Sequence, residues 1–239
     1  MESGADVTRF VQAVLAAGTP VIAEVKPRSA DGDDLLGGRD GAEIARTYVD
    51  AGAACLSVVT GRWFDGRLDM LRAVTSCTEL PVLQKDFITR EGQVATAVEL
   101  GAAAVLLTAG LLAPASLRRL VEQSLLAGLT PFVEVTCEAE IEAVPHPADC
   151  VIAVNNKDIK DGERGAGDPN RSTRLLPAVL ATGAACPVSA SGIDTPEQAA
   201  DLLTAGYAGL LVGTTLMRAA SPRDWFDDLR QRRVSGARR

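Results

Sequence analysis

The chain has 239 residues, a formal net charge of −7, 47% hydrophobic residues and only 4% aromatic residues. This length suits one large domain that buries enough surface to fold without disulfides or a structural metal. The acidic balance disfavours nucleic acid as a partner, because nucleic acid selects a basic face. No run of about 18 uninterrupted apolar residues occurs, so we expect no membrane span.

The chain holds five cysteines and one histidine. No two cysteines form a C-x-x-C pair, so a zinc site is not expected. The odd number of cysteines indicates reduced thiols, and the first residues lack the basic and apolar regions of a signal peptide. We therefore expect a cytoplasmic protein without a metal.

Short apolar runs alternate with helical patterns from one end of the chain to the other. The predicted strands are Val21–Val25, Cys55–Val59, Val82–Gln84, Ala104–Leu107, Pro131–Val135, Cys150–Val154, Pro187–Ser189 and Gly209–Val212. The predicted helices include Gly41–Ala51, Leu68–Cys77, Glu91–Leu100, Pro114–Ala127, Arg171–Leu180 and Pro196–Ala205. Near-continuously apolar strands that alternate with helices predict a parallel sheet covered on both faces.

An internal repeat favours closure of this sheet. Three stretches, which begin at Pro20, Pro81 and Pro187, each open with Pro-Val and later reach a glycine turn before the next strand. Such a glycine is typical of a helix C-cap. With eight strands, the repeat predicts an α/β fold with a single (β/α)₈ TIM barrel over residues 1–239. Residues 1–19 then form a short N-terminal segment, and residues 234–239 form a basic tail.

The segment from Lys26 to Asp40 breaks the regularity, because it is long, polar and rich in Gly and Asp. Long polar loops at the C-terminal face of a barrel are often substrate lids. The alternative is an insertion without a role. Trp63 and Phe64 lie in the next loop of this kind, where they either line a pocket or serve packing.

Polar residues gather where the predicted strands end, which is where barrel enzymes place their working residues. In chain order these ends carry Glu24 with Lys26, Thr60, Lys85, Thr108, Glu134, Asn155 with Asn156, Ser189 with Ser191, and Gly213. A buried charge is costly unless it is paired. Two lysines and two glutamates at one rim therefore predict a reactive cluster in which a lysine delivers a proton, rather than salt bridges that only fasten the barrel.

The last two strands predict an anion site. Ser191 and Gly192 follow the seventh strand, and Gly213 and Thr214 follow the eighth strand at the start of a short helix. Glycines let backbone N–H groups approach a phosphate, and a helix N-terminus favours negative charge. This is the usual phosphate position in such barrels, and Lys26 adds a counter-charge. The alternative is a pair of ordinary turns.

At these residues the chain resembles the indole-3-glycerol phosphate synthase family, the ring-closing enzymes of tryptophan biosynthesis. The resemblance covers nearly the whole barrel, and the order and spacing of its motifs are specific. The matching stretches are IAEVK (22–26), LSVVT (56–60), LPVLQKDFI (80–88), VEV (133–135), VNN (154–156), SGI (191–193) and LVGTTLM (211–217).

The resemblance implies a carboxy-lyase that acts on 1-(2-carboxyphenylamino)-1-deoxyribulose 5-phosphate. The reaction closes a pyrrole ring with loss of carbon dioxide and water, and it uses no cofactor. By position, Lys85 would be the general acid on the substrate ketone, and Glu24 would hold and tune it. Glu134 would stabilise positive charge or act in the dehydration, and Lys26 would bind anionic groups.

Asn155 completes the predicted catalytic set with these four residues, and the remaining site residues implied by the resemblance are binding groups. Asn155 and Ser191 would bind substrate hydroxyls, and Ser29 and Lys157 would contact the substrate elsewhere. Gly192, Gly213 and Thr214 would hold the phosphate. The expected partner is this small phosphorylated substrate, and the chain is expected to be a monomer or a homodimer.

The sequence also departs from the family pattern. The family reads Ser-Glu-Ser-Gly-Ile after the seventh strand, whereas Ala190 stands here in place of the glutamate. The family's Asn-Asn-Arg ends in Lys157, which cannot make the two-pronged contact of an arginine with a carboxylate. Two alternatives therefore stay open. One is a diverged relative acting on a related phosphorylated ketose in specialised metabolism, and the other is a non-catalytic barrel that binds a phosphate ligand.

Overall fold

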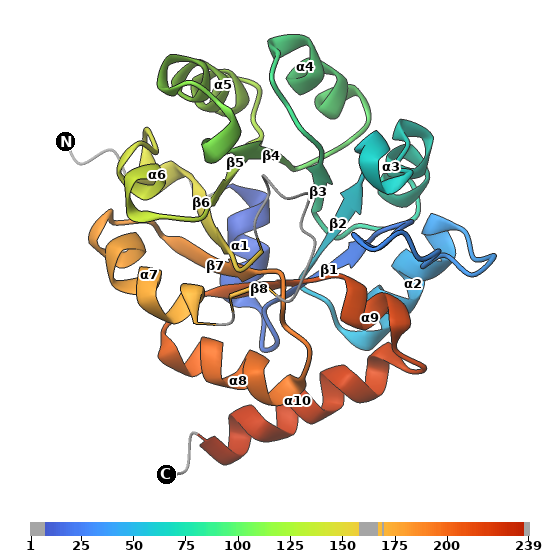
Figure 1. Ribbon diagram of the computed structural model, residues 1–239. Coiled ribbons are helices and arrows are strands. Elements are labelled where there is room, and N and C mark those ends of the chain that lie inside the picture. The colour runs from blue at the N-terminus through green and yellow to red at the C-terminus, as the bar shows by residue number, and fades with distance from the viewer. Residues whose placement is uncertain (1–7, 158–166, 169, 237–239) are drawn as a thin grey trace.

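The computed structural model describes residues 8–157, 167–168 and 170–236. Eight parallel strands pair in chain order, β1 to β8, and β8 closes onto β1. Figure 1 looks onto the C-terminal ends of these strands, with the helices arranged around them. The fold is therefore the single (β/α)₈ barrel that the sequence predicts.

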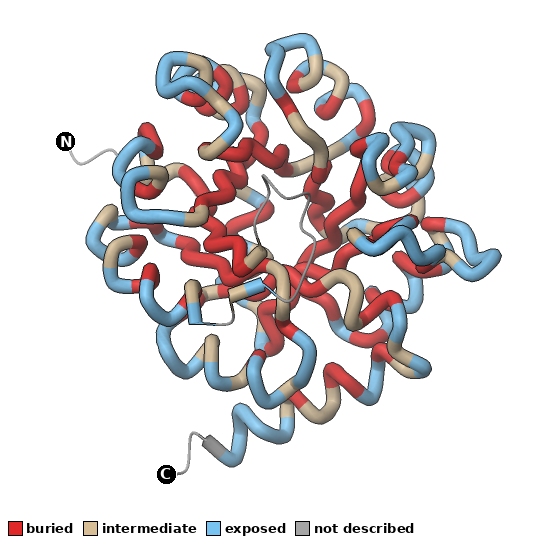
Figure 2. The backbone as a smooth tube through the Cα atoms, viewed as in Figure 1, coloured by how far each residue is buried: buried red, intermediate tan, exposed pale blue. Residues whose placement is uncertain are grey.

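The strands agree closely with the predicted runs. They are β1 (Val21–Val25), β2 (Cys55–Val59), β3 (Val82–Lys85), β4 (Ala104–Thr108), β5 (Thr130–Val135), β6 (Val151–Asn155), β7 (Cys186–Ala190) and β8 (Gly209–Val212). All of their residues are buried, because helices cover the outer face and side chains fill the inner one. Figure 2 shows this buried centre and the exposed outer rim of the helices.

Helices follow the strands and pack against them. They are α1 (Arg9–Ala16), α2 (Gly41–Ala51), α3 (Leu68–Thr75), α4 (Glu91–Glu99), α5 (Pro114–Leu126), α6 (Glu138–Glu142), α7 (Arg171–Ala181), α8 (Pro196–Ala205), α9 (Thr214–Arg218) and α10 (Pro222–Gly236). Sequence patterns identify α2, α3, α4, α5, α7, α8 and the short α9, but they miss α1, α6 and α10. Within the described residues, no helix combines the length and the apolar character that a membrane crossing requires.

The N-terminal end of the barrel is closed by α1, which lies behind the strands in Figure 1. We call this end the floor: Phe10, Val11 and Val14 of α1 with Ile22, Cys55, Phe132 and Cys186 of the strands, all in one buried cluster. The rings of Phe10 and Phe132 meet edge to face with centroids 6.2 Å apart. Burying one such side chain contributes about 1.5–3 kcal/mol, so the floor is a substantial source of stability.

The C-terminal end of the described chain is a helix, α10. Helix α10 packs against α2 and α8 and continues to Gly236, so the expected basic tail begins as helix. Arg230 anchors it by donating a hydrogen bond to the carbonyl of Ala51 at 3.1 Å. Phe226 and Leu229 of this helix are fully buried. The last expected tail residues, 237–239, lie outside the described part of the chain.

Candidate active site

Strand alternation sets the chemistry of the barrel interior. Ile22, Leu83 and Phe132 belong to the interior cluster, and the residues two positions further along the same strand faces are charged. We call the resulting set of polar side chains at the C-terminal ends of the strands the mouth ring. It consists of Glu24, Lys26, Lys85, Thr108, Glu134 and Asn155, which are at most 6% exposed. All five side chains predicted to be catalytic therefore meet at one rim.

A buried ion pair links two of these strands. The Nζ of Lys85 lies 3.8 Å from Oε2 of Glu24, and the hydroxyl of Ser57 donates to the same oxygen at 3.5 Å. Gly213 leaves room for this carboxylate, because a Cβ at that position would lie 2.4 Å from Oε1 of Glu24. Gly213 therefore leaves space for the Glu24 side chain, a role in addition to the phosphate contact that the sequence predicts.

The end of β3 is held by a compact polar cluster that fixes Lys85. The N–H of Thr60 donates to the carbonyl of Lys85 at 2.9 Å. The hydroxyl of Thr60 donates to Asp86 at 2.8 Å, and that carboxylate also accepts the N–H of Phe87 at 2.8 Å. Gln84 donates in turn to the Thr60 hydroxyl at 3.2 Å. These contacts fix the backbone at Lys85 and the residues on either side of it.

A small pocket lies beside the ion pair. It is lined by Val59, Gly61, Phe64, Lys85, Asp86, Phe87, Leu106 and Glu134. Phe64 lines it as expected, and the ammonium of Lys26 lies 4.0 Å from the centre of its ring, a cation–π contact. Trp63 is 74% exposed and packs edge to face on Phe87, with ring centroids 5.1 Å apart. The pocket therefore combines aromatic and aliphatic side chains with one lysine and two carboxylates.

The loop from Lys26 to Asp40 is fastened on both sides of the mouth. Arg28 pairs with Asp65 of the neighbouring loop at 2.9 Å, and Asp33 pairs with Arg218 of α9. The predicted binding residue Ser29 is buried, and its hydroxyl accepts the N–H of Asp33 at 3.0 Å. Ser29 thus shapes the loop.

The turn after β7 carries the predicted phosphate residues. Ser191 and Gly192 both have left-handed backbones, with φ of 65° and 66°. The side-chain amide of Asn156 donates to the carbonyl of Ser191 at 3.0 Å and to the hydroxyl of Ser189 at 3.3 Å. Ser172 of α7 closes this buried network by donating to Oδ1 of Asn156 at 2.9 Å. Gly213 and Thr214 meet this turn from the β8 side, where the hydroxyl of Thr215 donates to the carbonyl of Ile193 at 2.9 Å.

The end of β6 fixes the orientation of Asn155. Its Oδ1 accepts the N–H of Lys157 at 2.8 Å, and Arg171 donates to the carbonyls of both residues at 2.7 and 2.9 Å. Within the described ranges, Nδ2 of Asn155 has no hydrogen-bond partner. Ala190 is the register partner of Asn155 on β7 and is fully buried. This side of the mouth therefore offers an amide donor where the neighbouring strand contributes only a methyl group.

Comparison with known proteins identifies the family. A family model described as indole-3-glycerol phosphate synthase matches residues 3–229. This chain belongs to the indole-3-glycerol phosphate synthase family. The resemblance of the mouth ring to this family is thus one part of a match along nearly the whole chain.

Individual members of the family are similar over most of their length. The indole-3-glycerol phosphate synthase of Pyrococcus furiosus is 38% identical over 204 residues, which make up 85% of this chain and 88% of that protein. Indole-3-glycerol phosphate synthase 2 of Streptomyces coelicolor is 39% identical over 214 residues, 89% of this chain and 81% of that protein. These relatives favour the synthase over the diverged and non-catalytic alternatives.

A solved structure shows the same architecture at greater distance. The crystal structure of 3-hexulose-6-phosphate synthase from Salmonella typhimurium superposes with a TM-score of 0.68 and covers 90% of this chain and 98% of that one. At 14% sequence identity, this likeness concerns the barrel fold alone.

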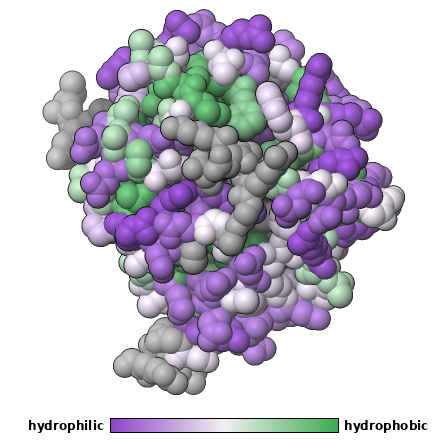
Figure 3. All heavy atoms as spheres, in the orientation of Figure 1, coloured by the Kyte–Doolittle hydropathy of each residue, from purple (hydrophilic) through white to green (hydrophobic). Residues whose placement is uncertain are grey.

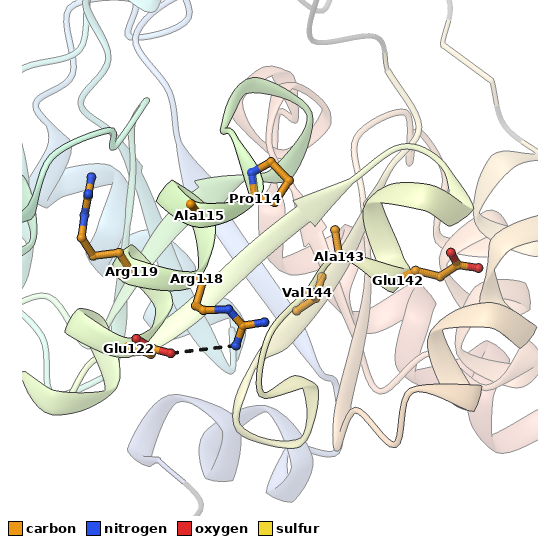
Figure 4. Close-up of a pocket in the computed structure, with 8 residues that line it drawn as sticks. All are labelled: Pro114, Ala115, Arg118, Arg119, Glu122, Glu142, Ala143 and Val144. Atoms are coloured by element: carbon orange, nitrogen blue, oxygen red, sulfur yellow. Dashed lines mark ion pairs between the residues drawn. The ribbon is translucent and has the colours of Figure 1, made fainter.

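A second hollow of this family member lies on the outside of the barrel. Figure 4 shows it between α5 and the end of α6, with Arg118, Arg119 and Glu122 on one side and Ala143 and Val144 on the other. Its two arginines face carboxylates, since Arg118 lies 4.0 Å from Glu122 and Arg119 lies 3.1 Å from Glu91. None of its lining residues comes from a strand end, so it is separate from the mouth.

The surface around the mouth is mixed in character. Figure 3 shows mostly hydrophilic side chains on this face, with hydrophobic ones gathered between α4 and α5, near the ends of β4 and β5. Leu111, in the turn after β4, is 47% exposed. Among the described residues, no group of three or more His, Cys, Asp or Glu side chains could hold a metal ion.

Proposed function

We propose that this chain is an indole-3-glycerol phosphate synthase, a carboxy-lyase that closes the indole ring of 1-(2-carboxyphenylamino)-1-deoxyribulose 5-phosphate. One observation supports this most strongly. The Lys85–Glu24 pair, with its 3.8 Å separation, is buried in the mouth beside a pocket that contains Phe64 and Phe87. A cation acid next to an aromatic-lined pocket is what ring closure onto a ketone requires.

The first step forms the carbon–carbon bond. The ring carbon that bears the carboxylate attacks the ketone carbon, and the ammonium of Lys85 gives its proton to the ketone oxygen. Glu24 favours the charged form of Lys85 before transfer, because an opposite charge lies close by. The carboxylate then leaves as carbon dioxide, and its bonding electrons restore the aromatic ring.

The second step removes water. The new hydroxyl takes a proton from solvent and leaves as water, and a proton is lost from the adjacent carbon to complete the pyrrole ring. Nitrogen carries positive charge as the hydroxyl departs, and Glu134, 1% exposed on β5, supplies a negative charge that stabilises it or accepts the proton. One proton is taken from water over the whole reaction, and it restores Lys85.

The remaining residues hold the substrate. Lys26 attracts its anionic groups, and the amide Nδ2 of Asn155, which has no hydrogen-bond partner among the described residues, is a donor for a hydroxyl. Ser191 binds a second hydroxyl, and Ser29 and Lys157 contact the substrate at the rim. The phosphate lies against the backbone of Gly192, Gly213 and Thr214, where a left-handed turn and the start of α9 face each other.

The setting follows from the same proposal. We expect the enzyme to work in the cytoplasm as a monomer or a homodimer, with no nucleic-acid partner and no cofactor. Burial raises the pKa of the Cys150 and Cys186 thiols to about 12, so both stay protonated and unreactive in a reducing compartment.

The test is direct incubation of the purified chain with the carboxyphenylamino substrate. We expect indole fluorescence to rise with time, at a rate proportional to enzyme and unchanged by a metal chelator. A folded chain that binds the reduced, unreactive analogue of the substrate but gives no indole signal contradicts the proposal.

A further inference from the structure

Thr108 is a member of the mouth ring that the mechanism above does not use. It is the last residue of β4 and is 4% exposed. Leu106 belongs to the interior cluster and Leu107 to the outer one, so alternation directs Thr108 into the barrel. Its register partner across the strand pair is Glu134. The Thr108 hydroxyl is therefore held on the inner face of the mouth beside a carboxylate.

This hydroxyl has no hydrogen-bond partner among the residues that the structure describes. Other buried hydroxyls do have partners: Thr130 at the floor end of β5 shares a 2.5 Å hydrogen bond with Thr8, and Ser124 donates to the Leu120 carbonyl at 2.7 Å. A buried hydroxyl without a partner costs stability, and a valine would fill the same space without that cost. Among the described residues, the Thr108 hydroxyl therefore makes no hydrogen bond that stabilises the folded chain.

The surroundings indicate which part of a substrate meets Thr108. Leu106 lies two residues before Thr108 on the same face of β4, and it lines the pocket with Phe64 and Phe87. In the proposed function, the aryl half of the substrate therefore lies on this side of the mouth. The charged groups that line the pocket are Lys85, Glu134 and Asp86, with Glu24 beside Lys85 and the Lys26 ammonium 4.0 Å from the Phe64 ring. A carboxylate on the aryl ring is attracted by the two lysines and repelled by the three carboxylates. A neutral hydroxyl donor on the strand next to Glu134 can hold one carboxylate oxygen without adding charge.

We propose that Thr108 is a specificity-determining residue whose hydroxyl donates a hydrogen bond to the carboxylate on the aryl ring of the substrate. The inference rests on the proposed function, because it needs an aryl carboxylate in the pocket. A hydrogen bond from a neutral hydroxyl to a carboxylate is charge-assisted, and it is stronger than one between neutral groups. Thr108 would thereby select substrates that carry the carboxylate that is later lost.

The experiment pairs two unreactive ligands with matched variants. One ligand is the reduced analogue 1-(2-carboxyphenylamino)-1-deoxyribitol 5-phosphate, and the other is its phenylamino counterpart without the carboxylate. For Thr108→Val, calorimetric titration should show about 10-fold weaker binding of the carboxylate ligand, the loss expected for one hydrogen bond to a charged group. Binding of the counterpart should change less than about 2-fold, and Thr108→Ser should restore most of the loss.

Stability supplies an independent readout. Removing an unpaired buried hydroxyl should raise the melting temperature of Thr108→Val by about 2–4 °C. The matched control is Thr130→Val, which removes a paired hydroxyl at the floor and should lower the melting temperature while leaving binding of both ligands unchanged.

Equal losses for both ligands, or no loss for either, overturn the assignment of Thr108 as the carboxylate donor. The proposed function fails separately, if the wild-type chain binds neither ligand or yields no indole from the reactive substrate. The Thr108 inference alone is contradicted if the wild-type chain turns over normally and Thr108→Val binds the carboxylate ligand as tightly as the wild type.

Discussion

The floor and the mouth ring are built on the same strands and are equally buried, yet their chemistry is opposite. The floor joins Phe10, Phe132 and their apolar neighbours, and its contacts are those of an ordinary protein core. The mouth ring buries two lysines and two glutamates within a few residues of them. Burial of apolar side chains stabilises a fold. Burial of charged side chains is unfavourable because of their lost hydration, and ion pairing offsets only part of that loss. The floor is therefore expected to contribute most to stability, and the mouth ring to provide the groups of the proposed mechanism.

The largest expected effect is at Lys85. Replacing it with alanine removes the proton donor, so we expect turnover to fall by about 10³-fold or more, within the range for loss of a general acid. Binding of the reduced substrate analogue should survive, as measured by calorimetric titration. Near-full activity in the variant would remove Lys85 from the acid role.

The counterpart at the floor is Phe132→Ala. This change empties space beside Phe10, and it should lower the free energy of unfolding by about 3–5 kcal/mol in denaturant titrations. Turnover per folded molecule at low temperature should stay within about 2-fold of wild type, because no mouth contact is touched. A large loss of turnover in folded protein would break the division between the two ends.

Gly213→Ala tests the seat of Glu24. The added Cβ would lie 2.4 Å from the Glu24 carboxylate, so the carboxylate must leave its present position, 3.8 Å from the Lys85 ammonium. We expect kcat to fall about 10- to 100-fold, as for a small misplacement of a catalytic group. The control Gly92→Ala adds a methyl group in open space on α4 and should leave kcat unchanged. Equal kcat in the two variants would show that Gly213 does not position Glu24.

The smallest effect concerns the floor thiols. Burial raises the pKa of Cys186 to about 12, and burial, with Cys186 nearby, also raises the pKa of Cys55. A raised pKa keeps the thiol protonated below that value, so reactivity appears only as pH approaches it or as the chain unfolds. Mass spectrometry after alkylation at pH 8 should find exposed Cys137 modified and both floor thiols intact. Rapid modification of Cys186 in native protein would show that the floor opens.

Much of this division is predictable from the sequence, because strand periodicity and burial are local. Alternation along Val21–Val25 already sets Ile22 toward the floor and Glu24 toward the mouth. Helix α1 is not predictable in this way, since it is short, its N-cap residue Thr8 makes no capping hydrogen bond, and its stability comes from packing under the barrel.

Residues that act through neighbours are the other part that the sequence leaves open. Asn156 stands out only as the second half of an Asn-Asn pair, and its contacts come from two other segments, Ser172 of α7 and Ser189 with Ser191 at the end of β7. Gly213 resembles any phosphate-loop glycine until the Glu24 side chain is placed against it. Thr108 is one of several polar strand ends in the sequence, and it differs from the others once its hydroxyl is found without a partner among the described residues. Each of these roles depends on contacts between strands far apart in the chain.

The most direct test of the account is the double variant Glu24→Gln with Lys85→Met, measured for both turnover and unfolding free energy. Replacing a buried ion pair by neutral side chains of similar size is often neutral or stabilising by about 1–4 kcal/mol. We expect the double variant to fold, to be at least as stable as the wild type, and to form no detectable indole. A variant that is strongly destabilised, or that still closes the ring, would contradict the claim that this pair is there for chemistry.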